Sequence, residues 1–276
     1  MKLRKLNTNI SGRNVLIEHD QHMYIQLHDQ PKELPHASSK SDDRLQDISM
    51  MDFQGKISMV LRAHAKQLGI HLPLNNGMYG VEIYITTQRP PNDVPIVQTT
   101  KAIVDAINNE VVCDDDEIYR LKINVRRFTS RSRANKSVPL DKVTLSIVDM
   151  TMNRTVIGFK ELCTFIVPKR NPFLVNGRDE EFFYPHLELY PHYVWQALSK
   201  DGFQMSSADE CAVRLSFTGA VQSKDLDNMA KCYLPIMFQS QSLEESNVVA
   251  LELLKVHDPN TKGLIEMHVN CNSTQP

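Results

Sequence analysis

Acidic residues late in the chain are placed so that they could hold a divalent cation. Asp225 and Asp227 follow one predicted strand and lead into a helix, and Glu244 and Glu245 begin the next predicted strand after that helix. Because sequential strands are usually neighbours in a sheet, we expect these carboxylates to converge. Oxygen ligands without cysteine or histidine favour Mg²⁺ or Mn²⁺ over zinc.

Such a site would support metal-assisted hydrolysis of a phosphodiester. A bound cation lowers the pKa of a coordinated water and stabilises the leaving oxygen. Lys231 comes one helical turn after Asp227 and would place a cation near the charge that develops on the phosphate. The alternative interpretation is an ordinary strand-to-helix turn in which Asp227 or Asn228 caps the helix.

The elements that must position these residues occur in the same order twice along the chain. Apolar residues alternate in the strands and recur at three- and four-residue steps in the helices. The predicted strands are 23–27, 81–86, 119–125, 143–147, 163–167, 213–217, 249–253 and 265–269, and the predicted helices are 49–68, 99–108, 190–200 and 225–238.

The two halves also correspond residue by residue. Segment 81–86 matches segment 213–218. From Lys101 against Lys231 the alignment shifts by two positions, and it then continues without a gap through an acidic turn in each half. A constant spacing of this kind indicates an internal duplication. We therefore predict an α/β (α+β) fold class with two similar domains, residues 1–150 and 151–276.

The segment Asp225-Leu-Asp-Asn-Met-Ala-Lys231 resembles the D-x-D-N-L-x-K signature of the RusA family of Holliday-junction resolvases. In the first half, segment 101–108 followed by segment 111–118 is similar to the family's K-x-x-x-D-A-L-N-G and D-D-x-Q-I motifs. Together the resemblances cover about 40–50 residues of each half.

The resemblance implies a Mg²⁺-dependent nuclease (Mn²⁺ being the other candidate metal) that acts as a homodimer, binds four-way DNA junctions and cuts them at aspartates. Two RusA-like domains in one chain would then form an intramolecular pseudo-dimer. Asp225 and Asp227 match the paired catalytic aspartates, Lys231 matches the motif lysine, and Glu245, with Glu244 beside it, matches the third acid.

The sequence also departs from the family pattern. Glutamate at 245 replaces an aspartate, and Pro235 stands where the family has a helix aspartate and is expected to kink or end the helix. In the first half the paired aspartates are replaced by Pro95 and Val97 in one alignment, or by Asp93 and Pro95 in the other. We therefore expect a second, degenerate site at Asp93, Lys101, Asp105, Asp114 and Asp115.

Positive charge is concentrated in one segment, although the 276 residues have a formal net charge of only −2. Residues 118–140 include seven Lys and Arg and no acidic residue, which is typical of a surface that contacts phosphates. A solvated loop without a partner is the alternative. The residues predicted to bind branched or duplex DNA are Arg126, Arg127, Arg131, Arg133, Lys136, Lys169 and Arg170.

Composition narrows the class of protein. Five cysteines at wide spacings match neither a zinc motif nor a disulfide framework, and they are typical of a reducing compartment. No run approaches the roughly 18 apolar residues of a membrane span, so we expect a cytoplasmic protein without a membrane partner, either a monomeric pseudo-dimer or a homo-oligomer.

Three functions are compatible with these patterns. The first is a structure-specific endonuclease, a hydrolase of branched DNA that would serve recombination or repair. The second is a RusA-like protein without catalysis that binds DNA or regulates another protein, in keeping with the replaced acids. The third is an unrelated two-domain interaction protein whose acidic turns are structural.

Overall fold

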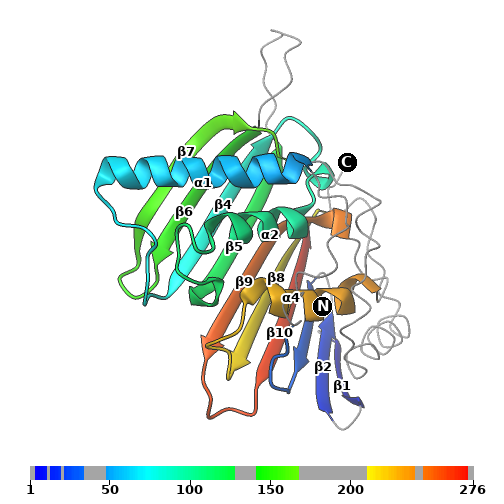
Figure 1. Ribbon diagram of the computed structural model, residues 1–276. Helices are drawn as coiled ribbons and strands as arrows, with labels where there is room; N and C mark the ends of the chain where they lie inside the picture. The colour runs from blue at the N-terminus through cyan, green and yellow to red at the C-terminus, as the bar shows by residue number, and fades with distance from the viewer. Residues whose placement is uncertain are drawn as a thin grey trace. The chain divides into compact units, whose positions relative to one another are not determined.

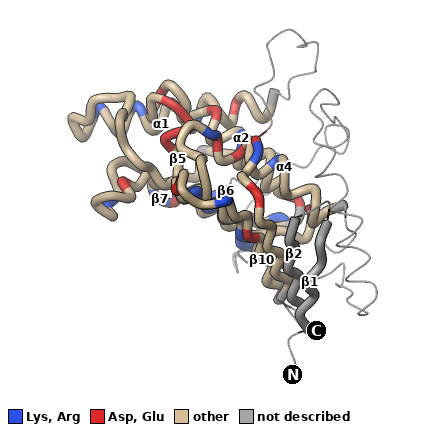
Figure 2. Tube along the Cα trace, turned by 90° about the horizontal axis from the view of Figure 1, so that it is seen from below, with Lys and Arg blue, Asp and Glu red and all other residues tan. Residues whose placement is uncertain are grey.

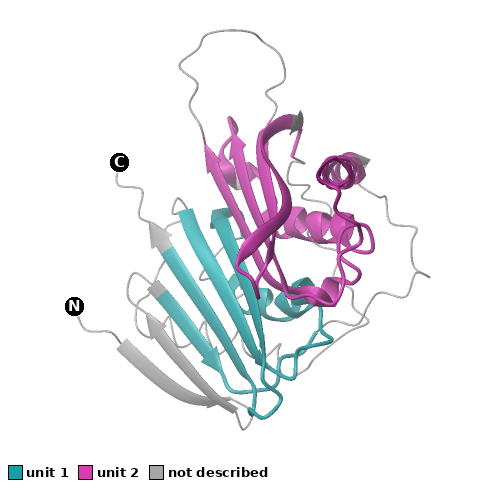
Figure 3. Ribbon diagram, turned by 90° about the vertical axis from the view of Figure 1, so that its left-hand side faces the viewer, with its two compact units in different colours: residues 1–35, 173–276 teal, residues 36–172 magenta. Residues whose placement is uncertain are grey.

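The computed structural model describes residues 4–10, 13–19, 22–33, 48–127, 141–167, 210–239 and 245–272 (Figure 1). The chain forms two compact units, which are coloured separately in Figure 3. Unit 1 contains residues 1–35 and 173–276, and unit 2 contains residues 36–172. Each unit has its own group of strands, against which at least one helix packs.

Unit 2 has the strand order β5-β4-β6-β7. Its strands are β4 (Tyr79–Thr87), β5 (Ile118–Arg127), β6 (Asp141–Asp149) and β7 (Arg154–Phe165). β4 is parallel to β5 and antiparallel to β6, and β6 is antiparallel to β7. The helices α1 (Ile48–Leu68) and α2 (Ile96–Ile107) pack on each other, and α1 also packs on β7.

Unit 1 has the strand order β1-β2-β3-β10-β8-β9. Its strands are β1 (Arg4–Ile10), β2 (Arg13–His19), β3 (His22–Leu27), β8 (Glu210–Gly219), β9 (Val248–His257) and β10 (Leu264–Asn272). β8 is parallel to β9 and antiparallel to β10, which in turn is antiparallel to β3. The helix α4 (Leu226–Gln239) packs against β9.

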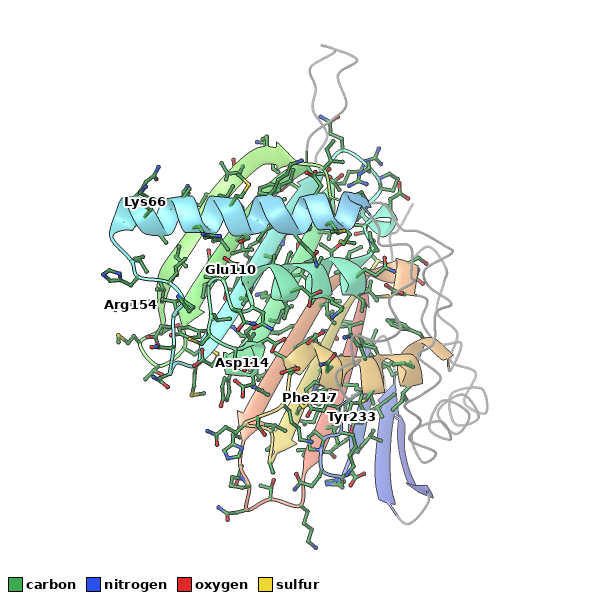
Figure 4. All side chains as sticks on the ribbon, in the orientation of Figure 1. Lys66, Glu110, Asp114, Arg154, Phe217 and Tyr233 are labelled. Carbon is green, nitrogen blue, oxygen red and sulfur yellow. The ribbon has the colours of Figure 1, made fainter. Side chains whose placement is uncertain are left out.

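Alternating apolar residues form both cores. On β5, Leu121, Ile123 and Val125 are buried, whereas the residues between them are half-buried. In unit 1 the ring of Phe217 on β8 lies 5.5 Å, centroid to centroid, from the ring of Tyr233 on α4, and Figure 4 labels both side chains. A period of two on each strand thus directs one face of the sheet toward the helices.

The two units repeat the same arrangement at a fixed spacing along the chain. β5 and β9 begin at positions 118 and 248, α2 and α4 at 96 and 226, and two short 3₁₀ turns, Asp115–Glu117 and Glu245–Asn247, at 115 and 245. In unit 2, Val81 pairs with Leu121, and in unit 1, Val213 pairs with Leu251. Both parallel pairs also have a register shift after their first residue pair.

β3 and β7 each lie in a different compact unit from the one that the predicted halves of the chain would give them. β3 precedes the helix α1 of unit 2 in the chain, yet it pairs with β10 of unit 1. β7 precedes β8 of unit 1, yet it pairs with β6 of unit 2. The compact units therefore differ from the predicted halves 1–150 and 151–276, because residues 1–35 belong to unit 1 and β7 belongs to unit 2.

The mixed α+β class predicted from the sequence is confirmed. α2 begins earlier than the predicted helix at Thr99, and β7 begins well before the predicted strand at Cys163. The hairpin of β1 and β2 was not predicted. The predicted helix at 190–200 lies outside the described residues.

Pro235 does not end α4. Proline at this position was expected to kink or end the helix, and α4 continues through it to Gln239. Proline removes one main-chain donor and adds a clash with the carbonyl four residues earlier, and the surrounding helix tolerates this here.

In the described part of the chain, no helix combines the length and apolar character that a membrane crossing requires.

Candidate active site

Asp225 occupies the residue position directly before α4 and is only 3% exposed. Its carbonyl oxygen accepts a hydrogen bond from the Met229 amide at 2.9 Å, which opens the helix. Its Oδ2 accepts a 2.9 Å hydrogen bond from Nδ2 of Asn228. The carboxylate is therefore held by the first turn of the helix that it precedes.

Asp227 belongs to the first turn of α4 and is 7% exposed. Its Oδ2 lies 3.0 Å from Nζ of Lys231, which also donates a 2.7 Å hydrogen bond to Oδ1 of Asn228. In an extended segment the side chains of Asp225 and Asp227 would lie on one side, but Asp227 belongs to the helix. The helix begins between the two residues, so its first turn sets their relative orientation.

Glu245 does not join this pair within unit 1. The prediction that β8 and β9 are neighbours is confirmed, and they are parallel, with Cys211 opposite Val248 and Gly219 opposite His257. Asp225 follows the C-terminal end of β8, whereas Glu245 directly precedes the N-terminal end of β9. These are opposite edges of the sheet, about 30 Å apart for ten-residue strands.

The expected convergence of four carboxylates is therefore wrong for unit 1. A helix that connects two parallel strands has to return the chain from one edge of the sheet to the other, so residues at its two ends are separated. Glu244 lies outside the described residues.

In unit 2 the helix that corresponds to α4 is α2, and α2 has no acidic pair at its start. The Thr99 amide donates to the Pro95 carbonyl at 2.8 Å, as the Met229 amide does to the Asp225 carbonyl. Because these are the first main-chain bonds of α2 and α4, Pro95 is equivalent to Asp225. The alignment that matches Lys101 with Lys231 thus holds at the helix start, and Asp93 lies exposed in a separate 3₁₀ turn.

The other residues of the predicted second site are dispersed over unit 2. Lys101 and Asp105 form an exposed ion pair on α2, with Nζ 3.2 Å from Oδ1. Asp114 accepts a 3.3 Å hydrogen bond from the Asp116 amide and thereby caps the 3₁₀ turn that Asp115 begins. This turn precedes β5, at the edge of the sheet opposite to the start of α2.

The sheet of unit 2 has a basic face. Strand residues that alternate with the buried core are half-buried or exposed, and the acids among them include Glu82 on β4 and Glu161 on β7. The basic residues of this face on β5 and β6 are Arg120, Lys122, Arg126 and Lys142. Figure 2 marks the charged positions along the trace.

Two of the four basic residues form ion pairs, whose lengths are 2.5 Å for Arg120 with Glu82 and 3.7 Å for Lys142 with Glu161. Arg126 and the adjacent Arg127 are exposed at the end of β5. The other residues predicted to contact DNA lie outside the described residues, namely Arg131, Arg133, Lys136, Lys169 and Arg170.

On the corresponding face of unit 1, charged residues of β8, β9 and β10 are paired with neighbouring strands. Arg214 of β8 faces Glu252 of β9, with Nε 3.7 Å from Oε2. Glu266 of β10 accepts hydrogen bonds from the Tyr24 hydroxyl at 2.7 Å and from the Ser216 hydroxyl at 3.1 Å. Here the charged groups hold neighbouring strands together.

The sequence interpretation missed a buried lysine that contacts the loop preceding the acidic pair. Lys255 of β9 is 2% exposed, and its Nζ donates to the main-chain oxygen of Lys224 at 2.8 Å and of Gln222 at 3.4 Å. A signal was available, because Lys255 continues the inward positions of Leu251 and Leu253. A charged residue at such a position usually has a specific partner.

Comparison with known proteins does not identify a family. No model of a known protein family matches the chain. No curated protein matches it either. The likeness to RusA resolvases is therefore carried by the motifs alone.

Proposed function

We propose that the chain is a Mg²⁺-dependent, structure-specific endonuclease that hydrolyses phosphodiesters in branched DNA. The observation that carries this proposal is the buried pair Asp225 and Asp227 at the start of α4, with Lys231 one turn further along the helix. The motif resembles that of RusA resolvases, and the helix start fixes both acids relative to each other.

The donor set fits a hard divalent cation. Asp225 and Asp227 offer carboxylate oxygens and no nitrogen or sulfur ligand, and Mg²⁺ is commonly bound through one or two carboxylates together with waters and substrate phosphates. When bound, the cation would supply an activated water and stabilise the leaving oxygen.

The residues around the acids have supporting roles. Asn228 donates to Oδ2 of Asp225 and fixes the orientation of that carboxylate. Lys231 is 27% exposed, so its ammonium group can reach a phosphate from the position in which it contacts Asp227. A cation at this point would stabilise the negative charge of the transition state.

We also propose that the chain is a fused pseudo-dimer. The shared spacing of equivalent elements and the equal strand registers support two copies of one ancestral unit. In this proposal unit 1 retains the acidic pair, while unit 2, with Pro95 and Val97 in its place, contributes the basic face to DNA binding.

Cleavage of a synthetic four-way junction by the full chain, with Mg²⁺ and with EDTA, tests the function. Asp225→Asn and Asp227→Asn should each abolish cutting and leave junction binding intact, because they remove ligand charge without changing shape. Asp93→Asn is the matched control and should cut normally. Undiminished cutting by both Asp225→Asn and Asp227→Asn would exclude this active site.

Further variants locate any third acid. Glu245→Gln removes the acid that the motif predicts, and Asp114→Asn with Asp115→Asn removes the equivalent acids of unit 2. Loss of cutting in either set, with junction binding retained, assigns the corresponding turn to catalysis. Normal cutting in both sets would mean that the acidic pair at the start of α4 is sufficient for catalysis without a third acid from either turn.

The second candidate is a RusA-like protein that binds DNA without cutting it. It is favoured by the position of Glu245 at the opposite edge of the unit 1 sheet from Asp225. This candidate predicts salt-sensitive junction binding and no cleavage in Mg²⁺ or Mn²⁺. Neutralising Arg131, Arg133 and Lys136 should weaken junction binding in both candidates, and unchanged binding would count against both.

A further inference from the structure

We infer that Lys255 is a positioning residue for the Asp225 and Asp227 pair, an inference that rests on the proposed function. The inference starts from one peptide group. The carbonyl oxygen of Lys224 accepts a 2.8 Å hydrogen bond from Nζ of Lys255. The amide of Asp225, which belongs to the same peptide group, donates a 3.0 Å hydrogen bond to Oε2 of Glu33.

The peptide group that carries Asp225 is thus fixed from both sides by charged side chains. Nζ of Lys255 also lies 3.4 Å from the Gln222 carbonyl oxygen, so one ammonium group ties together two carbonyls of the loop before α4. Charge-assisted hydrogen bonds of this kind are shorter and stronger than neutral ones. They fix the backbone from which the first carboxylate projects.

Stability alone does not explain a lysine at this position. Lys255 is 2% exposed, and the two preceding inward residues of β9, Leu251 and Leu253, are apolar. Burial of an ammonium group is costly unless it is fully compensated, and an apolar side chain of similar volume is often at least as stable. A functional reason for the charge is therefore the better explanation.

The other unit provides an internal comparison. Lys255 pairs with Phe217 across the parallel strands of unit 1, and Val125 pairs with Ile85 at the same register position of unit 2. Val125 is buried, so this position in the fold accepts an apolar residue. The lysine is present in the unit that has the acidic pair and absent from the unit that has lost it.

The role of Lys255 is to keep the start of α4 in one conformation when the carboxylates bind a cation. Residues that orient metal ligands through hydrogen bonds usually contribute about 10–100-fold to metal affinity or activity. Lys255 acts through the 222–225 backbone, so its loss should change metal binding and turnover without changing affinity for DNA.

The test compares Lys255→Met and Lys255→Arg with the wild-type full chain. Mn²⁺ binding is measured by calorimetry, junction cleavage in Mn²⁺, junction binding in EDTA, and folding by thermal unfolding. We expect the Met variant to be folded, to bind Mn²⁺ about 10-fold more weakly and to cleave about 100-fold more slowly. The Arg variant should recover part of both losses, and Lys262→Met, an exposed lysine of the same unit, should match wild type.

The direction of the change in affinity separates positioning from simple charge. Removing a positive charge near two carboxylates should by itself strengthen cation binding. A rise in Mn²⁺ affinity of Lys255→Met, or affinity and cleavage within twofold of wild type, overturns the positioning role. If the Met variant is unfolded, the Arg variant decides: Mn²⁺ binding weaker than wild type but stronger than in Asp225→Asn supports the inference, and Mn²⁺ binding equal to wild type overturns it.

Failure of the inference is distinguishable from failure of the proposed function. If wild type binds Mn²⁺ without cleaving and Lys255→Met loses that binding, the inference stands and the nuclease proposal falls. If wild type cleaves and Lys255→Met cleaves equally well, only the inference falls. If wild type neither binds Mn²⁺ nor cleaves, both are overturned.

Discussion

Lys231 and Asp227 form an ion pair one turn apart on α4, with Nζ 3.0 Å from Oδ2, and the carboxylate is the buried partner at 7% exposure. The equivalent lysine of unit 2, Lys101, pairs in the opposite direction, with Asp105 one turn later. The same position of the two helices thus directs a lysine toward the helix start in unit 1 and away from it in unit 2.

This difference predicts a specific effect of Lys231→Met. Loss of the ammonium group should strengthen Mn²⁺ binding, because a competing cation is removed from Asp227. Junction cleavage should fall by about 100-fold, because charge stabilisation at the phosphate is lost. Calorimetry and cleavage rates check both effects, and Lys101→Met is the matched control. Weaker Mn²⁺ binding by Lys231→Met would contradict the competing role of Lys231.

A buried ion pair should dominate the stability of the β6 and β7 end of unit 2. Asp141 is 2% exposed, and its Oδ2 lies 2.6 Å from Nη2 of Arg89 and accepts a 3.0 Å hydrogen bond from the Val167 amide. We expect Asp141→Ala to lower the free energy of unfolding by about 3–5 kcal/mol, because it leaves a nearly buried guanidinium group without its charge partner.

Urea unfolding measures this change. The control is the exposed pair of Lys142 and Glu161, whose atoms are 3.7 Å apart with side chains 39% and 75% exposed. Glu161→Ala should change the free energy of unfolding by less than about 1 kcal/mol. Equal effects of Asp141→Ala and Glu161→Ala on the free energy of unfolding would contradict a larger stabilising role of the buried ion pair.

The sequence predicted local structure well because the periodicity of strands and helices is local. Val213, Leu215 and Phe217 are buried on β8 as the alternation indicates. The helix start was predicted at Asp225, one residue before α4 begins, because the pattern of a strand followed by an aspartate and an amphipathic segment depends on neighbouring residues only.

Non-local pairing could not be predicted in the same way. Asp225 and Glu245 were expected to meet because their strands are sequential, but parallel pairing puts the two residues at opposite edges. Neither apolar period nor charge indicates that Ile25 of β3 pairs with Met267 of β10, across most of the chain. Lys255 went unnoticed because it donates to main-chain carbonyls, which every sequence has.

The thiol of Cys232 should make the free energy of unfolding depend on pH in the alkaline range. Burial, with Glu33 as a second cause, raises the pKa of Cys232 from 9.0 to about 12. Above pH 9 the unfolded chain loses this proton while the folded chain keeps it, so stability is fully present below pH 9 and decreases as the pH rises toward 12.

The expected slope is about 1.4 kcal/mol per pH unit from this one group. Urea unfolding of wild type and Cys232→Ala between pH 8 and pH 10.5 measures it, and the difference between the two proteins should decrease with pH. Cys163→Ala, which removes an exposed thiol, is the control and should leave the wild-type slope unchanged. Parallel pH profiles for wild type and Cys232→Ala would contradict a raised pKa.

The positions of β3 in unit 1 and β7 in unit 2 predict where core substitutions act. Ile25 of β3 is fully buried and belongs to the sheet of unit 1, and Phe165 at the end of β7 is fully buried in unit 2, where its ring stacks on Phe159 at 5.5 Å. Ile25→Ala and Phe165→Ala should each cost about 2–5 kcal/mol. Amide hydrogen exchange should show faster opening of β8 to β10 in Ile25→Ala and of β4 to β6 in Phe165→Ala. A division of the chain at residue 150 predicts the reverse pattern. Faster amide hydrogen exchange of β4 to β6 in Ile25→Ala would therefore contradict the placement of β3 in unit 1.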